Sequence, residues 1–372
     1  MKNIKLIFGI AFLFAVTISC SLEDGIDGDL SSLNSIQNPS NVATLIDITY
    51  DNSGNVKFTP SADSAGTYDI FYGDGTTTPG NVQSGNSIVH KYQEGDYTVK
   101  IVAKGLNGVN AEKTYPISVI YRTPEKLVVT TSIKVHNIKV KAVALYEVSY
   151  LVYFGDVANE VGTPMAIGEE LSHDYAEVGT YDVKVVALSG GAAPSIEETK
   201  ALKIYDAYML PITFEDPKVN YFFGTFDDWG QQKFSKEANP DPTGLNTSTN
   251  VGKYTSGHAG WSGTYSPLDA SIDFSTGNKV RIWVYNPDPA LIGKKLNVEL
   301  EAAVGGSPSN GVGVRKVAFT TSGEWEELVF DYSSIPGFPL ETAKFNQLVL
   351  RFDDTHTGAG AFFYIDNIRF TY

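Results

Sequence analysis

The chain of 372 residues contains a single cysteine, Cys20. A disulfide bond needs two cysteines, so none can form within the chain, and a zinc site built from cysteine ligands is excluded as well. Stability must therefore come from packed hydrophobic cores. A chain of this length suits two to four domains, each with a core of its own.

Positive charge is also scarce. The chain has 28 Lys and Arg against 43 Asp and Glu, a formal net charge of −15, and the basic residues are scattered. Nucleic acids and anionic lipid surfaces both need a concentrated positive face, so they are poor partners for this chain. An acidic surface is compatible with neutral ligands.

Recognisable catalytic motifs are missing. The sequence has no G-x-S-x-G elbow, no H-E-x-x-H and no phosphate-binding loop. Glycosidases hold two carboxylates about 5 to 9.5 Å apart across a cleft. The acidic pairs Asp227-Asp228 and Asp353-Asp354 are instead adjacent in loops, and Asp353-Asp354-Thr355-His356 favours a turn over an acid/base cluster. We therefore predict that the protein is not an enzyme.

Glycine and aromatic residues are abundant, with 35 Gly, 20 Phe and 21 Tyr. This composition favours many short strands joined by tight turns over long helices. We expect an all-β protein.

The N-terminus has the features of a signal peptide. Lys2 and Lys5 flank the start of an apolar run over residues 6–16, which is short for a membrane span and leads to Cys20. The pattern resembles a bacterial lipoprotein signal, in which the cysteine becomes the lipidated N-terminus, although Thr17 stands where Leu is usual. An ordinary secretory signal is the alternative.

Residues 21–40 follow as an acidic, glycine-containing segment that predicts a flexible tether. It resembles the export tag of surface lipoproteins in glycan-degrading Gram-negative bacteria, and a plain spacer is the alternative.

Two segments, 41–122 and 123–208, repeat the same landmarks. The Gly73-Asp74 turn, His90 and the strand around Tyr97 recur 82 to 84 residues later. That period is the length of a small β-sandwich and indicates a duplication. The landmarks resemble the PKD family of immunoglobulin-like domains, which implies two Ig-like sandwiches that serve as spacers or contact surfaces. Turn capping is the expected role of the aspartates, and we expect the histidines to be structural rather than metal ligands.

Residues 209–372 form the predicted terminal domain. Alternating strands separated by Pro and Gly turns predict a jelly-roll sandwich, with strands at 280–285, 296–301, 326–330, 348–352 and 362–370. The order of landmarks resembles the galactose-binding-like jelly rolls of carbohydrate-binding modules. These landmarks are Phe214-Glu215, residues 244–248, Trp261-Ser262-Gly263, residues 323–325 and residues 364–368.

Two of the four tryptophans, Trp229 and Trp261, lie in loops rich in Gly, Ser and Asp. An indole in such a setting can stack on a sugar ring, while neighbouring polar groups bind its hydroxyls. We predict that both contact a ligand, with Asp228 and Tyr254 as companions. Packing between domains is the alternative.

Trp283 and Arg281 share one face of a predicted strand, opposite Val280, Ile282 and Val284. The next strand has Asn297, Glu299 and Glu301 on one face. An aromatic and charged face spanning two strands would suit a sugar groove, and an Arg that simply stacks on Trp at the surface is the alternative.

The resemblance also implies a structural calcium ion. Glu215 on the opening strand and Asp366 on the closing strand match the acidic ligand positions of the family, where oxygen ligands meet. Two exposed acids on edge strands are the alternative.

The full layout resembles the surface glycan-binding proteins of polysaccharide-utilisation systems. It implies a lipid anchor in the outer membrane, exposure at the cell surface, capture of a polysaccharide and delivery to an outer-membrane importer. Within the family, a β-1,3-glucan such as laminarin is the best single ligand. The alternative is a surface adhesin that binds a protein.

Overall fold

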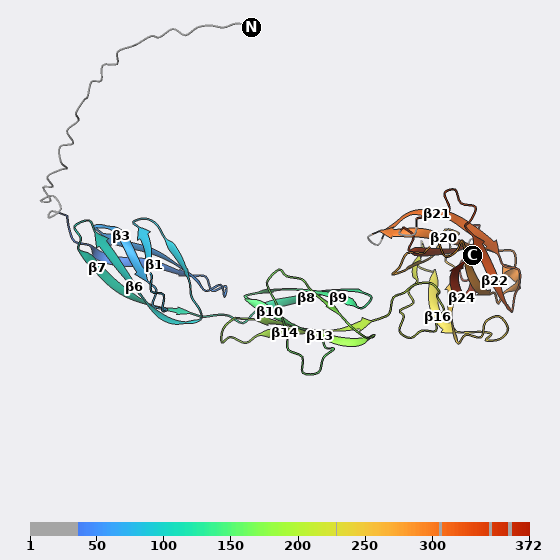
Figure 1. Ribbon diagram of the computed structural model, residues 1–372, viewed down its shortest axis with the longest axis horizontal. Coiled ribbons are helices and arrows are strands. Elements are labelled where there is room, and N and C mark those ends of the chain that lie inside the picture. Colours follow the sequence, from blue (N-terminus) through green and yellow to red (C-terminus); the bar gives the residue numbers. More distant parts are fainter. Residues whose placement is uncertain (1–35, 228, 305–306, 342–343, 356–358) are drawn as a thin grey trace, which may run out of the picture. The chain divides into compact units, whose positions relative to one another are not determined.

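The computed structural model describes residues 36–227, 229–304, 307–341, 344–355 and 359–372 (Figure 1). The predicted signal peptide, Cys20, most of the predicted tether and Asp228 lie outside these residues. Strands and one short 3-10 helix make up the regular structure of the described part. The all-β prediction is confirmed. Within the described residues, no helix has both the length and the apolar character needed to cross a membrane.

Two compact units can be distinguished. Of the described residues, one unit comprises those from 36 to 124 with Tyr146–Val148 and Ser189–Pro194, and the other comprises those of Glu125–Leu145, Ser149–Leu188 and Ser195–Tyr372. Three separate clusters of buried apolar side chains lie along the chain, over residues 42–121, 129–204 and 208–368. The domain boundaries expected near residues 122 and 208 remain predictions.

The first Ig-like sandwich has a three-stranded and a four-stranded antiparallel sheet. The smaller sheet has the order β1 (Ser40–Ile48), β2 (Asn55–Asp63), β5 (Ile88–Lys91). The larger has the order β4 (Gly80–Gln83), β3 (Ala65–Phe71), β6 (Gly95–Gly105), β7 (Asn110–Val119). Strand residues alternate between a buried and an open side, and Phe58, Tyr68 and Ile101 are fully buried between the sheets.

The second Ig-like sandwich repeats this strand order. Its smaller sheet has the order β12 (Leu171–Asp174), β9 (Asn137–Leu145), β8 (Glu125–Lys134). Its larger sheet has the order β11 (Thr163–Met165), β10 (Ser149–Tyr153), β13 (Gly179–Leu188), β14 (Ile196–Ile204). The identical order supports the predicted duplication.

Each repeat contains the same His–Asp pair beside an aromatic ring. His90 Nε2 lies 2.6 Å from Asp74 Oδ2, and the imidazole stacks on Tyr72 with 3.6 Å between ring centroids. In the second repeat, His173 lies 2.8 Å from Asp156 and stacks on Phe154. Asp74 also accepts a hydrogen bond from the backbone N–H of Thr76, which caps the turn.

The terminal domain is a sandwich of two five-stranded antiparallel sheets. The front sheet has the order β15 (Gly224–Phe226), β18 (Gly263–Pro267), β23 (Gln347–Phe352), β20 (Lys295–Val304), β21 (Ser307–Ala318). The back sheet has the order β16 (Lys233–Ala238), β17 (Asn250–Thr255), β24 (Phe362–Thr371), β19 (Lys279–Tyr285), β22 (Trp325–Asp331). The 3-10 helix η1 (Pro289–Leu291) lies between β19 and β20.

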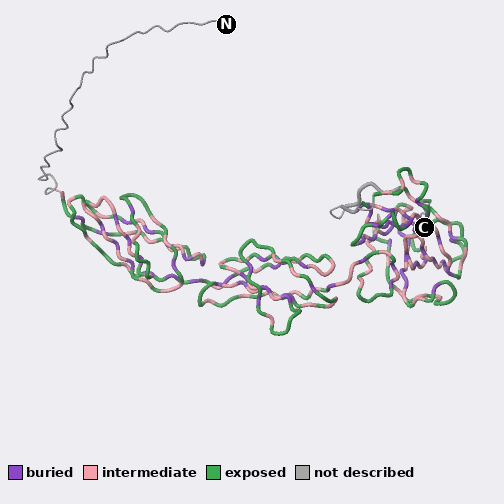
Figure 2. The backbone as a smooth tube through the Cα atoms, in the orientation of Figure 1, coloured by how far each residue is buried: buried purple, intermediate pink, exposed green. Residues whose placement is uncertain are grey.

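Buried residues are frequent along the strands of this domain (Figure 2). Alternate side chains of both sheets form its core. Val280, Ile282 and Val284 of β19 and Leu296 and Val298 of β20 are all fully buried. Each such side chain stabilises the fold by about 1.5 to 3 kcal/mol relative to its exposed state. Because side chains alternate along a strand, burying this set leaves the intervening residues on the two outer faces.

Candidate functional site

The outer face of the front sheet carries a group of polar side chains. On β20, Asn297, Glu299 and Glu301 alternate with core residues, and on β23 Arg351 and Gln347 do the same. Strand register places Arg351 beside Asn297, and Gln347 beside Glu301. These side chains therefore form two neighbouring rows on one surface.

The charged groups of this face are paired. Arg351 Nη2 donates to Glu299 Oε2 at 2.6 Å, and Gln347 Nε2 donates to Glu301 Oε2 at 2.8 Å. Burial raises the pKa of Glu299, and the Arg351 guanidinium opposes that shift. The face thus presents fixed donors and acceptors, the kind of groups that orient a ligand rich in hydroxyls.

Aromatic rings border the polar rows on β18 and before β15. Tyr265 is the register partner of Val349, which in turn pairs with Glu299. Phe222 is 46% exposed, and its ring centroid lies 6.1 Å from that of Tyr265. An aromatic edge beside polar groups is the combination that sugar rings require.

Trp261 lies at the end of the same face. With Lys316, Arg351 and Asp354, it lines a hollow of about 400 Å³. The indole is 52% exposed. The Asp354 carboxylate accepts hydrogen bonds from Lys316 and from Asn297 Nδ2. Asn297 Oδ1 is buried and has no hydrogen-bond partner within the described part of the chain.

Trp229 is also exposed, at 63%, and stacks on His258 with 3.8 Å between ring centroids. His258 belongs to the loop that carries Trp261. The structure therefore brings the two predicted tryptophan loops together. Asp228 lies outside the described residues.

The prediction that Tyr254 contacts a ligand is wrong. Its side chain is 0% exposed and its ring stacks on Phe363 within the core at 4.8 Å. A ring enclosed in this way has no face to offer a ligand. The inward side of β17 carries Gly252 and Tyr254, and Lys253 points to the outer side.

β19 pairs with β22 and β24, so it belongs to the back sheet. Because Ile282 and its alternate neighbours are buried in the core, Trp283 and Arg281 lie on the outer face of that sheet. The predicted face that would join them to Asn297, Glu299 and Glu301 does not exist, because β20 belongs to the front sheet. Arg281 Nη1 donates to Glu327 at 2.6 Å.

Trp283 makes a cation–π interaction with Arg369, whose guanidinium lies 5.4 Å from the centroid of the indole ring. Trp283 Nε1 is buried without an acceptor in the described residues. The role of Trp283 and Arg281 as ligand contacts remains a prediction, now separate from the front face.

Glu215 and Asp366 meet at one corner, although they are far apart in sequence. Glu215 Oε1 accepts from the Asn250 backbone N–H at 2.5 Å, while Asp366 Oδ2 accepts from Asn246 Nδ2 at 2.9 Å and from Ser248 Oγ at 2.7 Å. Burial raises the pKa of Asp366, and the charge of Glu215 adds to this rise.

The described residues contain no group of three or more His, Cys, Asp or Glu side chains placed to hold a metal. The corner offers the carboxylate oxygens of Glu215 and Asp366, whereas Asn246 turns its amide nitrogen to Asp366 and its amide oxygen accepts from the Ser248 backbone N–H. Carboxylate oxygens are ligands of the type that a hard cation such as calcium takes.

Sequence reasoning missed Arg351, Tyr265 and Phe222. The alternation of Gln347, Val349 and Arg351 between apolar residues marks an outward face of β23. What the sequence does not reveal is the pairing of β23 with β18 and β20, which assembles the surface.

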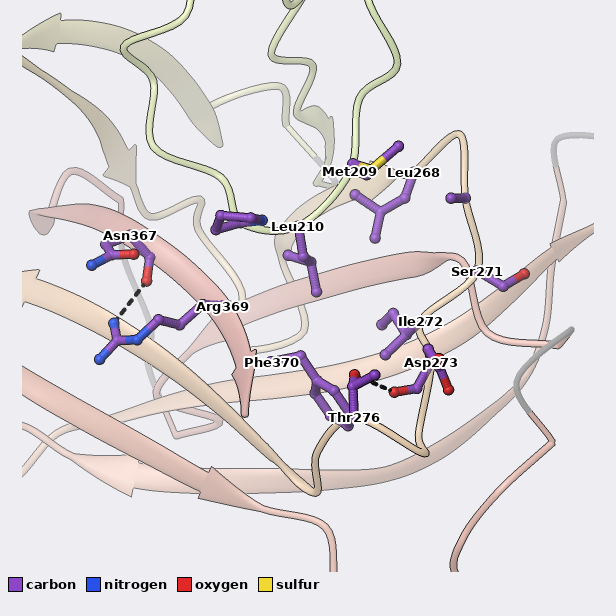
Figure 3. Close-up of a pocket in the computed structure, with 12 residues that line it drawn as sticks. Met209, Leu210, Leu268, Ser271, Ile272, Asp273, Thr276, Asn367, Arg369 and Phe370 are labelled. Carbon is purple, nitrogen blue, oxygen red and sulfur yellow. Dashed lines mark hydrogen bonds between the residues drawn. The ribbon is translucent and has the colours of Figure 1, made fainter. Parts of the chain in front are cut away.

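A pocket of about 420 Å³ lies elsewhere in the terminal domain (Figure 3). Leu210 and Met209 form one wall, and Ile272 and Phe370 lie across from them, with Arg369 to one side. Its walls combine apolar side chains with five polar or charged ones, and it contains none of the predicted ligand-binding residues. It therefore lacks the exposed indole found in the Trp261 hollow.

No family model matches the chain, and no curated protein matches it in sequence. Among solved structures, it is similar to a family 11 carbohydrate-binding module of a cellulosomal cellulase from Clostridium thermocellum. That match has a TM-score of 0.32 and 15% identity, and covers 45% of this chain and 95% of the module.

A second similar structure is the CBM22 xylan-binding domain of a Paenibacillus barcinonensis protein, with a TM-score of 0.27 and 18% identity. It covers 42% of this chain and 88% of that domain. Likeness of this degree carries no argument about ligand, so the candidate site rests on its own geometry.

Proposed function

We propose that the outer face of the front sheet binds a polysaccharide. The observation that carries this proposal is the convergence, on one outward face, of Trp261 and Tyr265 with Arg351, Glu299 and Gln347. Aromatic rings supply apolar faces for sugar rings, and fixed polar groups supply hydrogen bonds to hydroxyls. Our preferred ligand is a β-1,3-glucan such as laminarin, which follows from the family resemblance of the sequence.

Binding without catalysis is part of the proposal. Each carboxylate of the front face already accepts hydrogen bonds: Glu299 from Arg351, Glu301 from Gln347 and Asp354 from Lys316. Carboxylates engaged in this way serve to position other groups. Release of reducing ends from a bound glycan would contradict this part.

We further propose that the protein is anchored by a lipid on Cys20 in the outer membrane, faces outward and passes glycan to an importer. The lipoprotein-like signal and the acidic tether motivate this proposal. Labelling with a radioactive fatty acid, compared between the natural chain and Cys20→Ala, tests the anchor. Protease treatment of intact cells tests exposure.

Calcium binding at the corner formed by Glu215 and Asp366 is proposed as a structural feature. Bound there, the ion would join the opening and closing segments of the terminal domain. Its ligands would be the carboxylate oxygens of Glu215 and Asp366.

The central test is affinity electrophoresis of the protein without its signal. Gels would contain laminarin, mixed-linkage β-glucan, xylan, mannan or pectin. Retardation by one glycan that Trp261→Ala and Tyr265→Ala both abolish is the expected result. Tyr50→Ala removes an aromatic that is 51% exposed on the first unit and serves as the matched control. Absence of retardation on every glycan would favour the alternative function, a surface adhesin that binds protein.

A further inference from the structure

The two exposed tryptophans sit on loops that leave the same end of the front sheet. Trp229 follows β15, and Trp261 precedes β18. These strands are register partners, with Phe226 opposite Gly263. The loops therefore start side by side, and their relative position depends on what connects them.

One carboxylate connects the loops. Asp227 Oδ2 accepts hydrogen bonds from the backbone N–H groups of Gln231 at 2.6 Å and Gln232 at 2.9 Å. Asp227 Oδ1 accepts a hydrogen bond from Ser262 Oγ at 3.1 Å. Ser262 is only 3% exposed, so this link is shielded from water. Asp227 thus orders its own loop with one oxygen and holds the second loop with the other.

A second buried link runs parallel to the first. Gln232 Oε1 accepts a hydrogen bond from the Gly257 backbone N–H at 2.7 Å, and Gln232 is 3% exposed. A Cβ atom on Gly257 would come within 2.7 Å of the Asp227 carboxyl group, so this side chain packs directly against the backbone of the second loop. Above these links, Trp229 stacks on His258.

We propose that Asp227 is a positioning residue that holds residues 229–232 and the loop 256–262 as one unit, so that Trp229 and Trp261 engage glycan together. This inference rests on the proposed function. A pair of indoles fixed before binding loses little conformational freedom when the ligand arrives, which strengthens binding without any new contact. A carboxylate suits the role because it can accept several hydrogen bonds and has no donor of its own to conflict with them.

Ser262→Ala is the sharpest variant, because it removes the Asp227 link between the loops and leaves the hydrogen bonds within the Asp227 loop in place. The Gln232–Gly257 link also remains, and the variant additionally loses the hydrogen bond from the Ala259 backbone N–H to the same hydroxyl. We expect affinity for the retained glycan to fall roughly 5- to 20-fold. Ser189→Ala is the matched control. That serine is 2% exposed in the first unit, and its hydroxyl donates to Ala193 O at 2.7 Å. The control should bind like the natural protein.

A double-mutant cycle separates positioning from general stability. In the natural protein, the losses caused by Trp229→Ala and Trp261→Ala should not add, because each indole depends on the other's loop. In the Ser262→Ala background the coupling between the two losses should shrink, because only the Gln232–Gly257 link and the Trp229–His258 stack still join the loops. Unchanged affinity of Ser262→Ala, or coupling as large in that background as in the natural protein, would overturn the proposal.

A measurement without glycan keeps the inference separate from the proposed function. In protein labelled with 5-fluorotryptophan, Ser262→Ala should shift the 19F resonances of both Trp229 and Trp261 and leave those of Trp283 and Trp325 in place. If the Trp229 resonance does not move, the loops are not one unit and the inference fails. If no glycan binds but both resonances shift, the loop unit stands and the glycan proposal fails.

Discussion

The ring of Tyr265 lies against the backbone of Gly224, its register partner on the neighbouring strand. A Cβ atom on Gly224 would come within 2.3 Å of that ring. The absence of a side chain at Gly224 therefore gives Tyr265 its place on the front face. Gly224 does not have a positive φ, so the reason for a glycine here is the close approach of the ring.

Gly224→Ala should displace the Tyr265 ring and weaken glycan binding. We expect affinity to fall about 3- to 10-fold, the size of one lost aromatic stacking contact. The melting temperature should change little, because the end of a tyrosine side chain can move. Isothermal titration calorimetry measures the affinity, and Thr225→Ala on the same strand is the control. If Gly224→Ala binds like the natural protein while Tyr265→Ala does not, the glycine does not set the position of the ring.

Removing Arg351 should destabilise the terminal domain in a pH-dependent way. Arg351→Met leaves Glu299 partly buried without its cation, and burial already raises the pKa of Glu299. We expect a loss of about 1 to 3 kcal/mol in the free energy of unfolding at pH 8. The loss should shrink toward pH 5, because protonation of Glu299 removes the unpaired charge.

Urea unfolding at the two pH values measures this effect. Adding Glu299→Gln to Arg351→Met should recover much of the lost stability at pH 8. The control is Lys139→Met, which breaks a more exposed pair with Glu170 and should cost less than about 1 kcal/mol. A loss equal at both pH values would indicate that Arg351 acts through packing alone.

Calcium should stabilise the terminal domain if Glu215 and Asp366 hold it. At a concentration 100 times its dissociation constant, the ion would add about 2.7 kcal/mol to the free energy of unfolding. Protein stripped with a chelator and then titrated with calcium should show a raised melting temperature. Glu215→Gln and Asp366→Asn should each abolish that shift, while Glu237→Gln on the back sheet should keep it. A shift that survives both substitutions would place the ion elsewhere.

Much of the fold could be predicted because strand alternation is a local signal. The predicted strands at 280–285 and 296–301 correspond to β19 (Lys279–Tyr285) and β20 (Lys295–Val304). The side of each strand that packs in the core was also predicted, since Ile282 and Val298 are fully buried as their pattern indicates. Local alternation therefore identifies both the strands and their two faces.

The site was harder to predict, because it depends on which strands pair. The row Tyr265, Val349, Glu299 joins three strands that are far apart in sequence. The outward faces of β19 and β20, which are consecutive strands in the sequence, were expected to form one sugar groove. The two strands instead belong to opposite sheets. Tyr254 failed as a prediction for a related reason, since β17 is a short strand whose inward side is fixed by its pairing with β24. The exposure of Trp261 was predicted, because its loop composition alone marks an indole with few apolar neighbours. Its contact with a ligand stays a prediction.

Acid should weaken the first Ig-like sandwich through Asp74. Burial disfavours the charged carboxyl, but hydrogen bonds from His90 and Thr76 outweigh it and hold the pKa of Asp74 at about 2. An unfolded Asp has a pKa near 3.9. Because the folded value is lower, the stabilisation is complete above the unfolded pKa and is lost as pH falls from about 4 to about 2. Its size is about 2 kcal/mol.

Native-state hydrogen exchange of β6 as a function of pH measures this loss. Asp74→Asn should lower the protection of β6 at pH 6 and remove the part of the pH dependence between about 4 and 2. Asp47→Asn changes an exposed aspartate on β1 and should leave the profile intact. If Asp74→Asn lowers protection equally at every pH, the carboxyl contributes through the shape of its turn. The charge interaction with His90 would then not be the source of the stability.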